Sequence, residues 1–491
     1  MCVKWDRQEK GSDKVENGVR RKIRLTATIA LCAVLGSAAC VWNGNSPKRA
    51  NAAPAIFAVA AAGDHTMALR DNQFLVWGGN GFGSLGLGES SPLLVYAPTS
   101  NELRGVVSIS NSQSHSLALL GNGELWGFGS NYYMNLGSGS EVAYTPRRIT
   151  GIADVQSAAA GIHSTLALKR DGSVWEWGNF PDRVAQERQT PKQVSGLPSG
   201  IKTIAKTWET SYAITGAGEL YAWGNNNLGQ VGSALAATWQ YVPIRVNIGS
   251  GVKAVASGRY HTIALKEDGT VWQWGYAGCS PNPPNHNASP ERLLNLPTIK
   301  AIASGDTHNL AIDAEGKVHA WGCYPHDNNS DWMQPTTVDS LSNVIAIAGG
   351  TRHSVAMTSD GNIWAWGNNL QGQIGDGSAS SRRTPVRVAD GPPDQPKGLR
   401  ATAGPGSIHL TWTRGEEDVH RYELSCRTKS SGVCVKNYLL GTSTSFTMTS
   451  LSYLNQYEFV LVAIDWLGQR SAPSAPIIAK PRPSKKEPIL R

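Results

Sequence analysis

The chain has 491 residues, of which 17% are charged, 53 are glycine and 17 are tryptophan. This length exceeds one ordinary domain, and abundant glycine with recurrent aromatic residues favours an all-β fold of many short strands. The formal net charge is +8, but residues 53–391 hold 22 basic and 25 acidic residues, a net charge of −3. This central part lacks the basic excess of a nucleic-acid-binding surface, so we expect no nucleic-acid partner.

Residues 1–52 have the layout of an export signal. Basic residues between positions 20 and 24 precede an uncharged run over residues 25–41, and Ala50-Asn51-Ala52 forms a small-residue cleavage site. We predict cleavage after Ala52 and a secreted or cell-surface protein. An uncleaved N-terminal membrane anchor and a lipoprotein modified at Cys40 are the alternatives.

A Trp-Gly motif recurs seven times in residues 53–391, every 45 to 51 residues. Its copies are Trp77-Gly78, Trp126-Gly127, Trp177-Gly178, Trp223-Gly224, Trp274-Gly275, Trp321-Gly322 and Trp366-Gly367. A histidine or tyrosine stands 11 to 14 residues before each copy, at His65, His115, His163, Tyr212, His261, His308 and His353. Such a period indicates a repeat architecture.

The chemistry of this repeat is that of short β-strands. Asp-Gly, as in Asp268-Gly269, is a two-residue turn signal, and Trp272 and Trp274 alternate with the period of a strand. A four-stranded sheet cannot bury both of its faces alone, whereas seven sheets stacked around an axis can. The sequence therefore predicts an all-β chain whose residues 53–391 form a seven-bladed β-propeller.

Two stretches resemble the regulator of chromosome condensation repeat. They are Gly161-Ile-His-Ser-Thr-Leu-Ala-Leu168 and Asp360-Gly-Asn-Ile-Trp-Ala-Trp-Gly367, the latter followed by Asn-Asn-Leu-Gln-Gly-Gln-Ile-Gly375. The resemblance covers residues 55–390, implies a seven-bladed propeller and extends to exported bacterial propellers that inhibit enzymes through one rim. The family's guanine-nucleotide exchange activity is a weaker expectation because export separates the chain from intracellular GTPases. Its plant photoreceptors carry a tryptophan that Gly258-Arg-Tyr-His-Thr262 lacks.

The repeated histidines occur once per repeat, each beside a serine, threonine or asparagine. Catalysis does not require one histidine in every repeat. We therefore predict that they hold turns through side-chain-to-backbone hydrogen bonds.

The segment after Trp-Gly varies among repeats. Leu228–Gly232 and Gln371–Gly375 keep a Gly-Gln-hydrophobic-Gly ending, whereas repeats three, five and six have lost it. Scaffold positions should repeat and recognition positions should not, so we predict one partner-binding patch on the loops of repeats five and six. Its candidate residues are Tyr276, His286, Tyr324, His326 and Trp332. The alternative is that these loops have drifted without function.

Four cysteines lie beyond the leader, at Cys279, Cys323, Cys426 and Cys434. Cys279 and Cys323 follow their Trp-Gly pairs at comparable offsets, so we predict a disulfide between repeats five and six. Cys426 and Cys434 flank a hairpin-like stretch and form a second candidate pair. A metal site formed by Cys279 and Cys323 with His286, His326 or Asp327 is the alternative, but its ligand spacing matches no compact zinc pattern, so we expect neither a metal site nor a cofactor.

Residues 392–396 form a proline-rich linker, and seven short alternating strands follow over residues 397–479. Trp412, Tyr422, Leu451 and Tyr457 resemble the core of a fibronectin type III module, which implies a β-sandwich. Residues 480–491 form a basic, proline-rich tail.

No enzyme motif is present: the sequence has no phosphate-binding glycine loop after a strand, no G-x-S-x-G and no H-E-x-x-H. We therefore expect a monomeric, non-enzymatic binding or adaptor protein that recognises a protein partner, with enzyme inhibition as a specific form. An accessory carbohydrate- or cell-wall-binding protein is the alternative. We expect membrane contact only through an uncleaved N-terminal segment.

Overall fold

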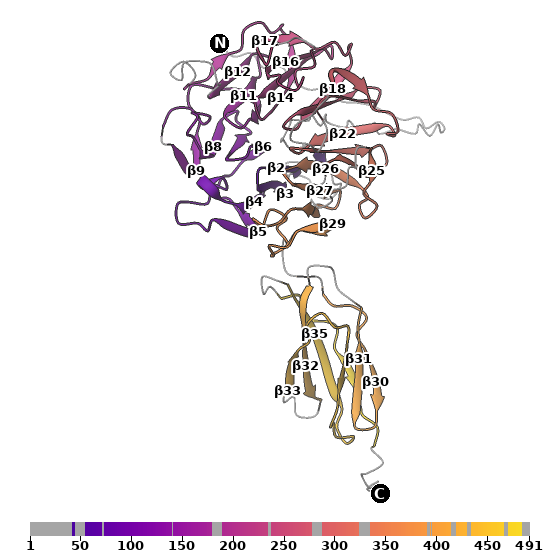
Figure 1. The fold of residues 1–491 in the computed structure, drawn as a ribbon. Coiled ribbons are helices and arrows are strands. Elements are labelled where there is room, and N and C mark those ends of the chain that lie inside the picture. The colour runs from indigo at the N-terminus through magenta and orange to yellow at the C-terminus, as the bar shows by residue number, and fades with distance from the viewer. Residues whose placement is uncertain are drawn as a thin grey trace, which may run out of the picture. The chain divides into compact units, whose positions relative to one another are not determined.

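The computed structural model describes residues 42–44, 55–70, 73–139, 141–178, 189–233, 237–276, 287–323, 334–389, 393, 395–413, 419–429, 434–465 and 470–483. Seven antiparallel sheets follow one another in sequence order and surround a common centre (Figure 1). Two further sheets form the β-sandwich predicted for the C-terminal part. Across the described ranges, no helix has the length and apolar character needed to cross a membrane.

Each of the seven sheets is one blade of consecutive strands. The first strands, which lie nearest the centre, are β2 (Ala55–Ala62), β6 (Val106–Asn111), β10 (Val155–Ala160), β14 (Ile201–Thr207), β18 (Val252–Ser257), β22 (Ile299–Ser304) and β26 (Val344–Gly349). The second strands are β3 (His65–Arg70), β7 (His115–Leu120), β11 (Ser164–Lys169), β15 (Thr210–Thr215), β19 (His261–Lys266), β23 (His308–Asp313) and β27 (His353–Thr358).

The outer half of each blade contains the third and fourth strands. The third strands are β4 (Gln73–Gly79), β8 (Leu125–Ser130), β12 (Val174–Gly178), β16 (Leu220–Asn225), β20 (Val271–Gly275), β24 (Val318–Gly322) and β28 (Ile363–Gly367). The fourth strands are β5 (Leu94–Ser100), β9 (Val142–Arg148), β13 (Lys192–Gln193), β17 (Trp239–Arg245), β21 (Asn287–Arg292), β25 (Thr336–Thr337) and β29 (Arg382–Arg387). A short strand, β1 (Trp42–Gly44), also pairs with β2, and a 3-10 turn, η1 (Gly81–Gly83), follows β4.

The strand register corrects part of the predicted repeat. In every blade, a glycine of the third strand pairs with the first residue of the second strand: Gly78 with His65, Gly129 with His115, Gly178 with Ser164, Gly224 with Thr210, Gly275 with His261, Gly322 with His308 and Gly367 with His353. Phe128-Gly129 therefore takes the place predicted for Trp126-Gly127. Ser164 and Thr210 likewise take the places predicted for His163 and Tyr212.

The five equivalent histidines connect neighbouring blades. His65 Nε2 lies 2.9 Å from Ser116 Oγ, and His353 Nε2 lies 2.9 Å from Thr66 Oγ1. Similar bonds join His261 to Asn309 (2.8 Å) and His308 to Ser354 (2.9 Å), and His115 Nε2 lies 3.5 Å from Thr165 Oγ1. The histidines are buried scaffold residues, as predicted, but these partners are side chains of the next blade and not turn backbone.

The ring closes between the seventh and first blades, where β26 lies beside β2. Thr66 donates to the carbonyl oxygen of Gln373 at 2.9 Å, and Trp77 Nε1 donates to the same oxygen at 3.0 Å. In the described residues, each of these blades uses strands from one continuous segment. Closure therefore depends on side-chain packing and hydrogen bonds between the two ends of the ring.

The C-terminal sandwich has two sheets. One contains β30 (Arg400–Gly404), β31 (Ser407–Thr411) and β34 (Ser445–Met448), and the other contains β33 (Cys434–Leu439), β32 (Val419–Thr428), β35 (Tyr457–Asp465) and β36 (Ile477–Ala479). The predicted core residues Trp412, Tyr422, Leu451 and Tyr457 are all buried. The rings of Trp412 and Tyr422 meet edge to face with centroids 5.5 Å apart.

Cys426 does not form the disulfide proposed for it, because it is present as a buried thiol. The register of β32 and β33 places Cys434 opposite Arg427, and a bulge separates this pair from Cys426 and Lys436. Successive residues of a strand face opposite sides, so Cys426 packs in the core while Arg427 points outward to Glu458. The side chain of Cys434 lies outside the described set.

Candidate functional site

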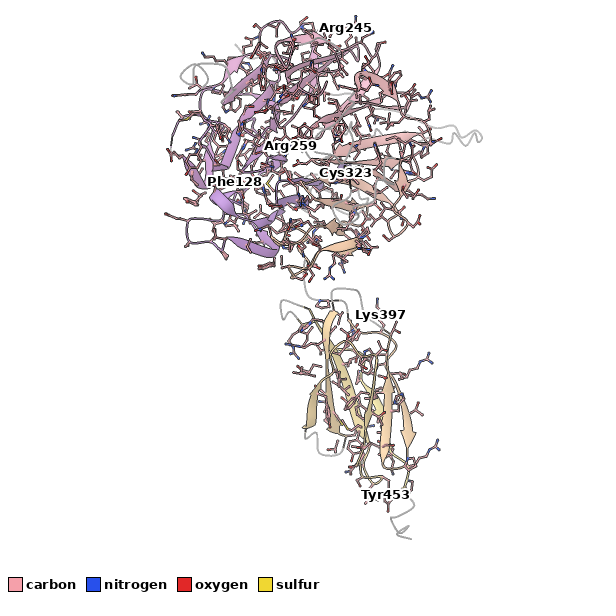
Figure 2. The ribbon with its side chains drawn as sticks, in the orientation of Figure 1. Phe128, Arg245, Arg259, Cys323, Lys397 and Tyr453 are labelled. Atoms are coloured by element: carbon pink, nitrogen blue, oxygen red, sulfur yellow. The ribbon has the colours of Figure 1, made fainter. Side chains whose placement is uncertain are left out.

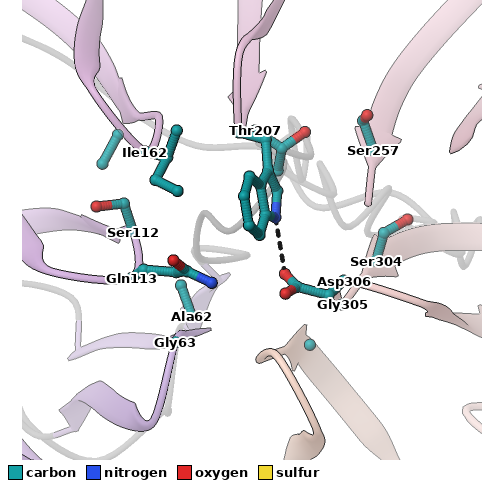
Figure 3. Close-up of a pocket in the computed structure, with 13 residues that line it drawn as sticks. Ala62, Gly63, Ser112, Gln113, Ile162, Thr207, Ser257, Ser304, Gly305 and Asp306 are labelled. Atoms are coloured by element: carbon teal, nitrogen blue, oxygen red, sulfur yellow. Dashed lines mark hydrogen bonds between the residues drawn. The ribbon is translucent and has the colours of Figure 1, made fainter. Parts of the chain in front are cut away.

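The turns that join the first and second strands all lie at one end of the ring, around the mouth of its central channel (Figure 3). One residue of each turn forms what we call the collar: Gly63, Gln113, Ile162, Trp208, Arg259, Asp306 and Thr351. The loops that leave the third strands reach the same end, which we call the collar face. The backbone N–H groups of Tyr276 and Cys323, for example, donate to the carbonyls of Tyr260 (2.7 Å) and Thr307 (2.8 Å).

The collar differs from the strands below it because its residues do not repeat. A small cavity, open to solvent, lies at the channel mouth between the collar and the ends of the first strands. The strand ends supply small residues, including Ser112, Thr207, Ser257 and Ser304. The collar places an indole and a carboxylate over this small-residue floor (Figure 3).

Trp208 is the most unusual collar residue. Its φ is +40°, in the left-handed region that glycine favours, and the equivalent residue of the first blade is Gly63 with φ +54°. Its indole Nε1 donates to Asp306 Oδ1 at 3.0 Å, so one hydrogen bond joins the fourth blade to the sixth (Figure 3). The guanidinium of Arg259 lies 4.4 Å from the Trp208 ring centroid and 4.9 Å from that of Tyr260.

Charged groups of both signs surround the mouth. Burial raises the pKa of Asp306 above its usual value, although the Trp208 N–H and the Arg259 charge partly oppose this. Burial also raises the pKa of Asp64, against the opposing charge of Arg352. On the turn that carries Trp208, the hydrogen bond with His163 lowers the pKa of Glu209. The collar face therefore presents local charges of both signs.

A second feature of the collar face is a group of exposed rings, which we call the aromatic patch. It consists of Phe82, Tyr132, Tyr133 and Tyr144, whose exposed fractions are 53%, 51%, 42% and 39%. Phe82 and Tyr132 meet edge to face with centroids 5.9 Å apart, and Tyr133 contacts His163 with centroids 3.9 Å apart. Most aromatic residues bury their rings, so a group of exposed ones is a candidate binding surface.

Asparagine side chains fix the conformation of the two loops that carry Phe82, Tyr132 and Tyr133. Asn80 Oδ1 accepts from the N–H of Leu85 at 3.0 Å, and Asn131 Oδ1 accepts from the N–H of Leu136 at 2.7 Å. Both leucines are buried. Each loop thus folds around its asparagine and leucine, which leaves its aromatic residues facing solvent.

The structure places one of the five predicted binding residues. Tyr276 lies partly buried on the collar face at the end of β20, whereas His286, Tyr324, His326 and Trp332 lie outside the described residues. Cys323 is disulfide-bonded. Its predicted partner Cys279 is also outside the described residues.

Sequence reasoning missed both the collar and the aromatic patch. The collar residues lie just before the first residue of the second strand, at positions that the repeat pattern does not specify. Three of the four patch residues lie in loops after the third strand, and Tyr144 lies on β9. Among the described residues, no group of three or more His, Cys, Asp or Glu side chains is arranged to hold a metal ion.

Comparisons with known proteins agree with this architecture. Two profiles of the regulator of chromosome condensation (RCC1) repeat match residues 106–133, 252–280, 299–330 and 344–373, and residues 122–168, 217–265 and 360–404. A fibronectin type III profile matches residues 394–480.

Among curated relatives, the ultraviolet-B receptor UVR8 of Arabidopsis thaliana is 30% identical over 240 residues, covering 45% of this chain and 53% of the receptor. The probable E3 ubiquitin-protein ligase HERC6 of Homo sapiens is 29% identical over 203 residues, covering 36% of this chain and 19% of the ligase. The chain thus spans about half or less of the length of these relatives.

Solved structures show the same propeller fold. Human WBSCR16 superposes with a TM-score of 0.59 at 21% identity, covering 67% of this chain and 96% of that protein. Prp20p from Saccharomyces cerevisiae gives a TM-score of 0.58 at 23% identity, covering 65% of this chain and 86% of that protein.

Proposed function

We propose that this chain, which carries regulator of chromosome condensation repeats and a fibronectin type III domain, is a non-enzymatic binding protein that recognises a protein partner through its collar face. The aromatic patch is the observation that carries this proposal. Four of the five aromatic side chains among the exposed large hydrophobic residues of the described propeller belong to it. Exposed Tyr and Phe anchors on a rigid frame are typical of protein interfaces.

The fold supports a protein as the ligand class. The structural study of Prp20p describes its binding to Gsp1p and histones, so one propeller of this architecture presents protein-binding surfaces. The central segment of the present chain has a net charge of −3. That charge favours recognition through aromatic anchors and local charges over a general attraction to polyanions.

We further propose that the protein works outside the cytoplasm, secreted or at the cell surface. The disulfide at Cys323 supports this location, because disulfides persist mainly in oxidising compartments. The leader-like pattern of residues 1–52 supports it independently.

The test is capture of partners from the producer's extracellular and cell-wall fractions by the purified protein. The double variant Phe82→Ala/Tyr132→Ala should lose a specific protein partner, with affinity falling about 30-fold or more, as expected when interface anchors are removed. The matched control is Tyr241→Ala, since Tyr241 is 43% exposed but lies on β17, away from the aromatic patch. This control should bind normally.

Two outcomes would overturn the proposal. Equal capture of one protein by the double variant and the wild type would remove the aromatic patch from recognition. Capture of wall polymer alone by all three forms would favour the carbohydrate-binding alternative. A fourth protein, with residues 276–290 and 323–334 replaced by the loop type of residues 368–375, tests the predicted patch of repeats five and six.

A further inference from the structure

The carboxylate of Asp306, at the mouth of the channel, forms no close ion pair with the residues that the structure describes. Within the part of the chain that the structure describes, no Lys, Arg or His nitrogen lies within 4.0 Å of it, and its hydrogen bond from Trp208 comes from a neutral group. Arg259 is nearby, but its guanidinium lies over the rings of Trp208 and Tyr260. A partly buried carboxylate without an ion pair favours a cation that comes from outside.

A second polar group at the same cavity is also unused. Thr207 is 7% exposed and lines the cavity, and its hydroxyl oxygen has no hydrogen-bond partner among the described residues. The other hydroxyls of the cavity floor are engaged: Ser257 donates to the His261 carbonyl at 2.9 Å, and Ser304 donates to Asn309 at 2.7 Å. Buried hydroxyls normally have partners, so Thr207 points to a donor or acceptor supplied by a ligand.

The third component is the indole of Trp208. Its backbone occupies a conformation that disfavours a bulky side chain, so the surrounding structure must hold the ring at the channel mouth. The position of Arg259 shows that this ring accepts a guanidinium against its face, 4.4 Å from the centroid. Arg259 is exposed, and its charge acts on Asp306 without a contact within 4.0 Å.

We propose that the channel mouth binds the guanidinium of an arginine side chain presented by the protein partner. This inference rests on the proposed function and adds the chemistry of the contact. Asp306 supplies the negative charge, Thr207 accepts an N–H bond, and Trp208 packs against the planar cation (Figure 3). Arginine fits better than lysine because its group is planar, carries five donors and stacks on aromatic rings.

The experiment uses the full chain labelled with 5-fluorotryptophan and observed by fluorine NMR. The Trp208 resonance is assigned by its loss in Trp208→Phe, and the probe is N-acetyl-L-arginine amide. We expect this resonance to shift saturably with the arginine probe and not with N-acetyl-L-citrulline amide, its neutral analogue. Asp306→Asn should weaken probe binding about tenfold or more while keeping an acceptor for the indole N–H.

Asp268→Asn is the matched control, because it removes one exposed carboxylate in the turn between β19 and β20, away from the channel mouth, and should leave probe affinity within about twofold. Thr207→Val is a second variant, in which loss of one hydrogen bond should weaken binding about threefold or more. Absence of a saturable Trp208 shift, an equal response to citrulline, or unchanged affinity in Asp306→Asn would overturn the inference. Phe82→Ala/Tyr132→Ala should still bind the probe, so failure of the aromatic patch and failure of this site are distinguishable.

Discussion

Glu176 and Lys206 form a buried ion pair between the third and fourth blades. Lys206 Nζ lies 2.9 Å from Glu176 Oε1, and both side chains are almost fully buried. Ser211 also donates to Oε1 at 2.8 Å, and Trp223 Nε1 donates to Oε2 at 3.1 Å. The pair satisfies several donors at once, which is the condition under which a buried charge is tolerated.

This arrangement predicts a strong asymmetry between single and double substitutions. Lys206→Met leaves the Glu176 charge buried without its partner and should lower the free energy of unfolding by about 3–5 kcal/mol. Glu176→Gln/Lys206→Met removes both charges and keeps an acceptor for Trp223, so most of that loss should be recovered. Urea unfolding followed by tryptophan fluorescence measures both. A double variant as unstable as the single one would show that the charges themselves stabilise the ring.

At the scale of elements, the third strands share a Trp-x-Trp pattern or a variant of it, as in Trp364-Ala365-Trp366. The middle residue of this pattern varies with the loop that follows the strand. In four blades the loop buries a leucine, isoleucine or valine, and the middle residue is small or apolar: Val76, Gly127, Ala222 and Ala365. A Cβ on Gly127 would lie 2.6 Å from Leu136 Cδ2. This loop type is missing from three blades. In two of them, Glu176 and Gln273 stand in the middle and accept from the next blade's tryptophan, Trp223 or Trp321, whereas the sixth blade has Ala320. In the third and fifth blades, a longer polar side chain thus supplies an acceptor for that indole.

Gln273 provides the test of this replacement. Its Oε1 accepts from Trp321 Nε1 at 2.9 Å, so Gln273→Ala should leave a buried indole N–H without that partner and destabilise the protein by about 1–3 kcal/mol. Gln273→Met restores volume without the acceptor and should remain destabilised. The exposed Gln193 on β13 is the matched control, and Gln193→Ala should unfold like the wild type. Full stability of the methionine variant would show that volume alone matters.

These elements also show where sequence reasoning succeeds and where it stops. Turn signals such as Asp268-Gly269 and the alternation of Trp272 and Trp274 identify the strands, because both follow from local backbone geometry. Register is set by pairing across strands. Trp126-Gly127 matches the Trp-Gly motif but lies two residues before Gly129, the glycine that pairs with His115. The channel mouth could not be predicted for a similar reason, since only ring closure brings Trp208 and Asp306 together.

At the scale of the whole ring, the belt of buried histidines makes its stability depend on pH. Burial lowers the pKa of His65, His261 and His308 to about 4, and that of His115 and His353 to about 3. In the unfolded chain these groups titrate near their ordinary value of 6.5. At pH values between these pKa values, the unfolded state therefore binds more protons than the folded state. The contribution of the neutral histidines to the free energy of unfolding is present above pH 6.5 and decreases as the pH falls toward 4.

One substitution isolates the contribution of a single histidine. His261→Thr installs the residue that the fourth blade has at the same place, Thr210, and removes one titrating group. A pKa of about 4 against 6.5 corresponds to about 3 kcal/mol, so between pH 7 and pH 4 the variant should lose about 3 kcal/mol less stability than the wild type. Urea unfolding at a series of pH values measures the two slopes. His409→Ala, at an exposed position of the sandwich, should retain the wild-type slope. Parallel curves for His261→Thr and the wild type would mean that His261 is not kept neutral in the folded ring and that other groups govern its acid sensitivity.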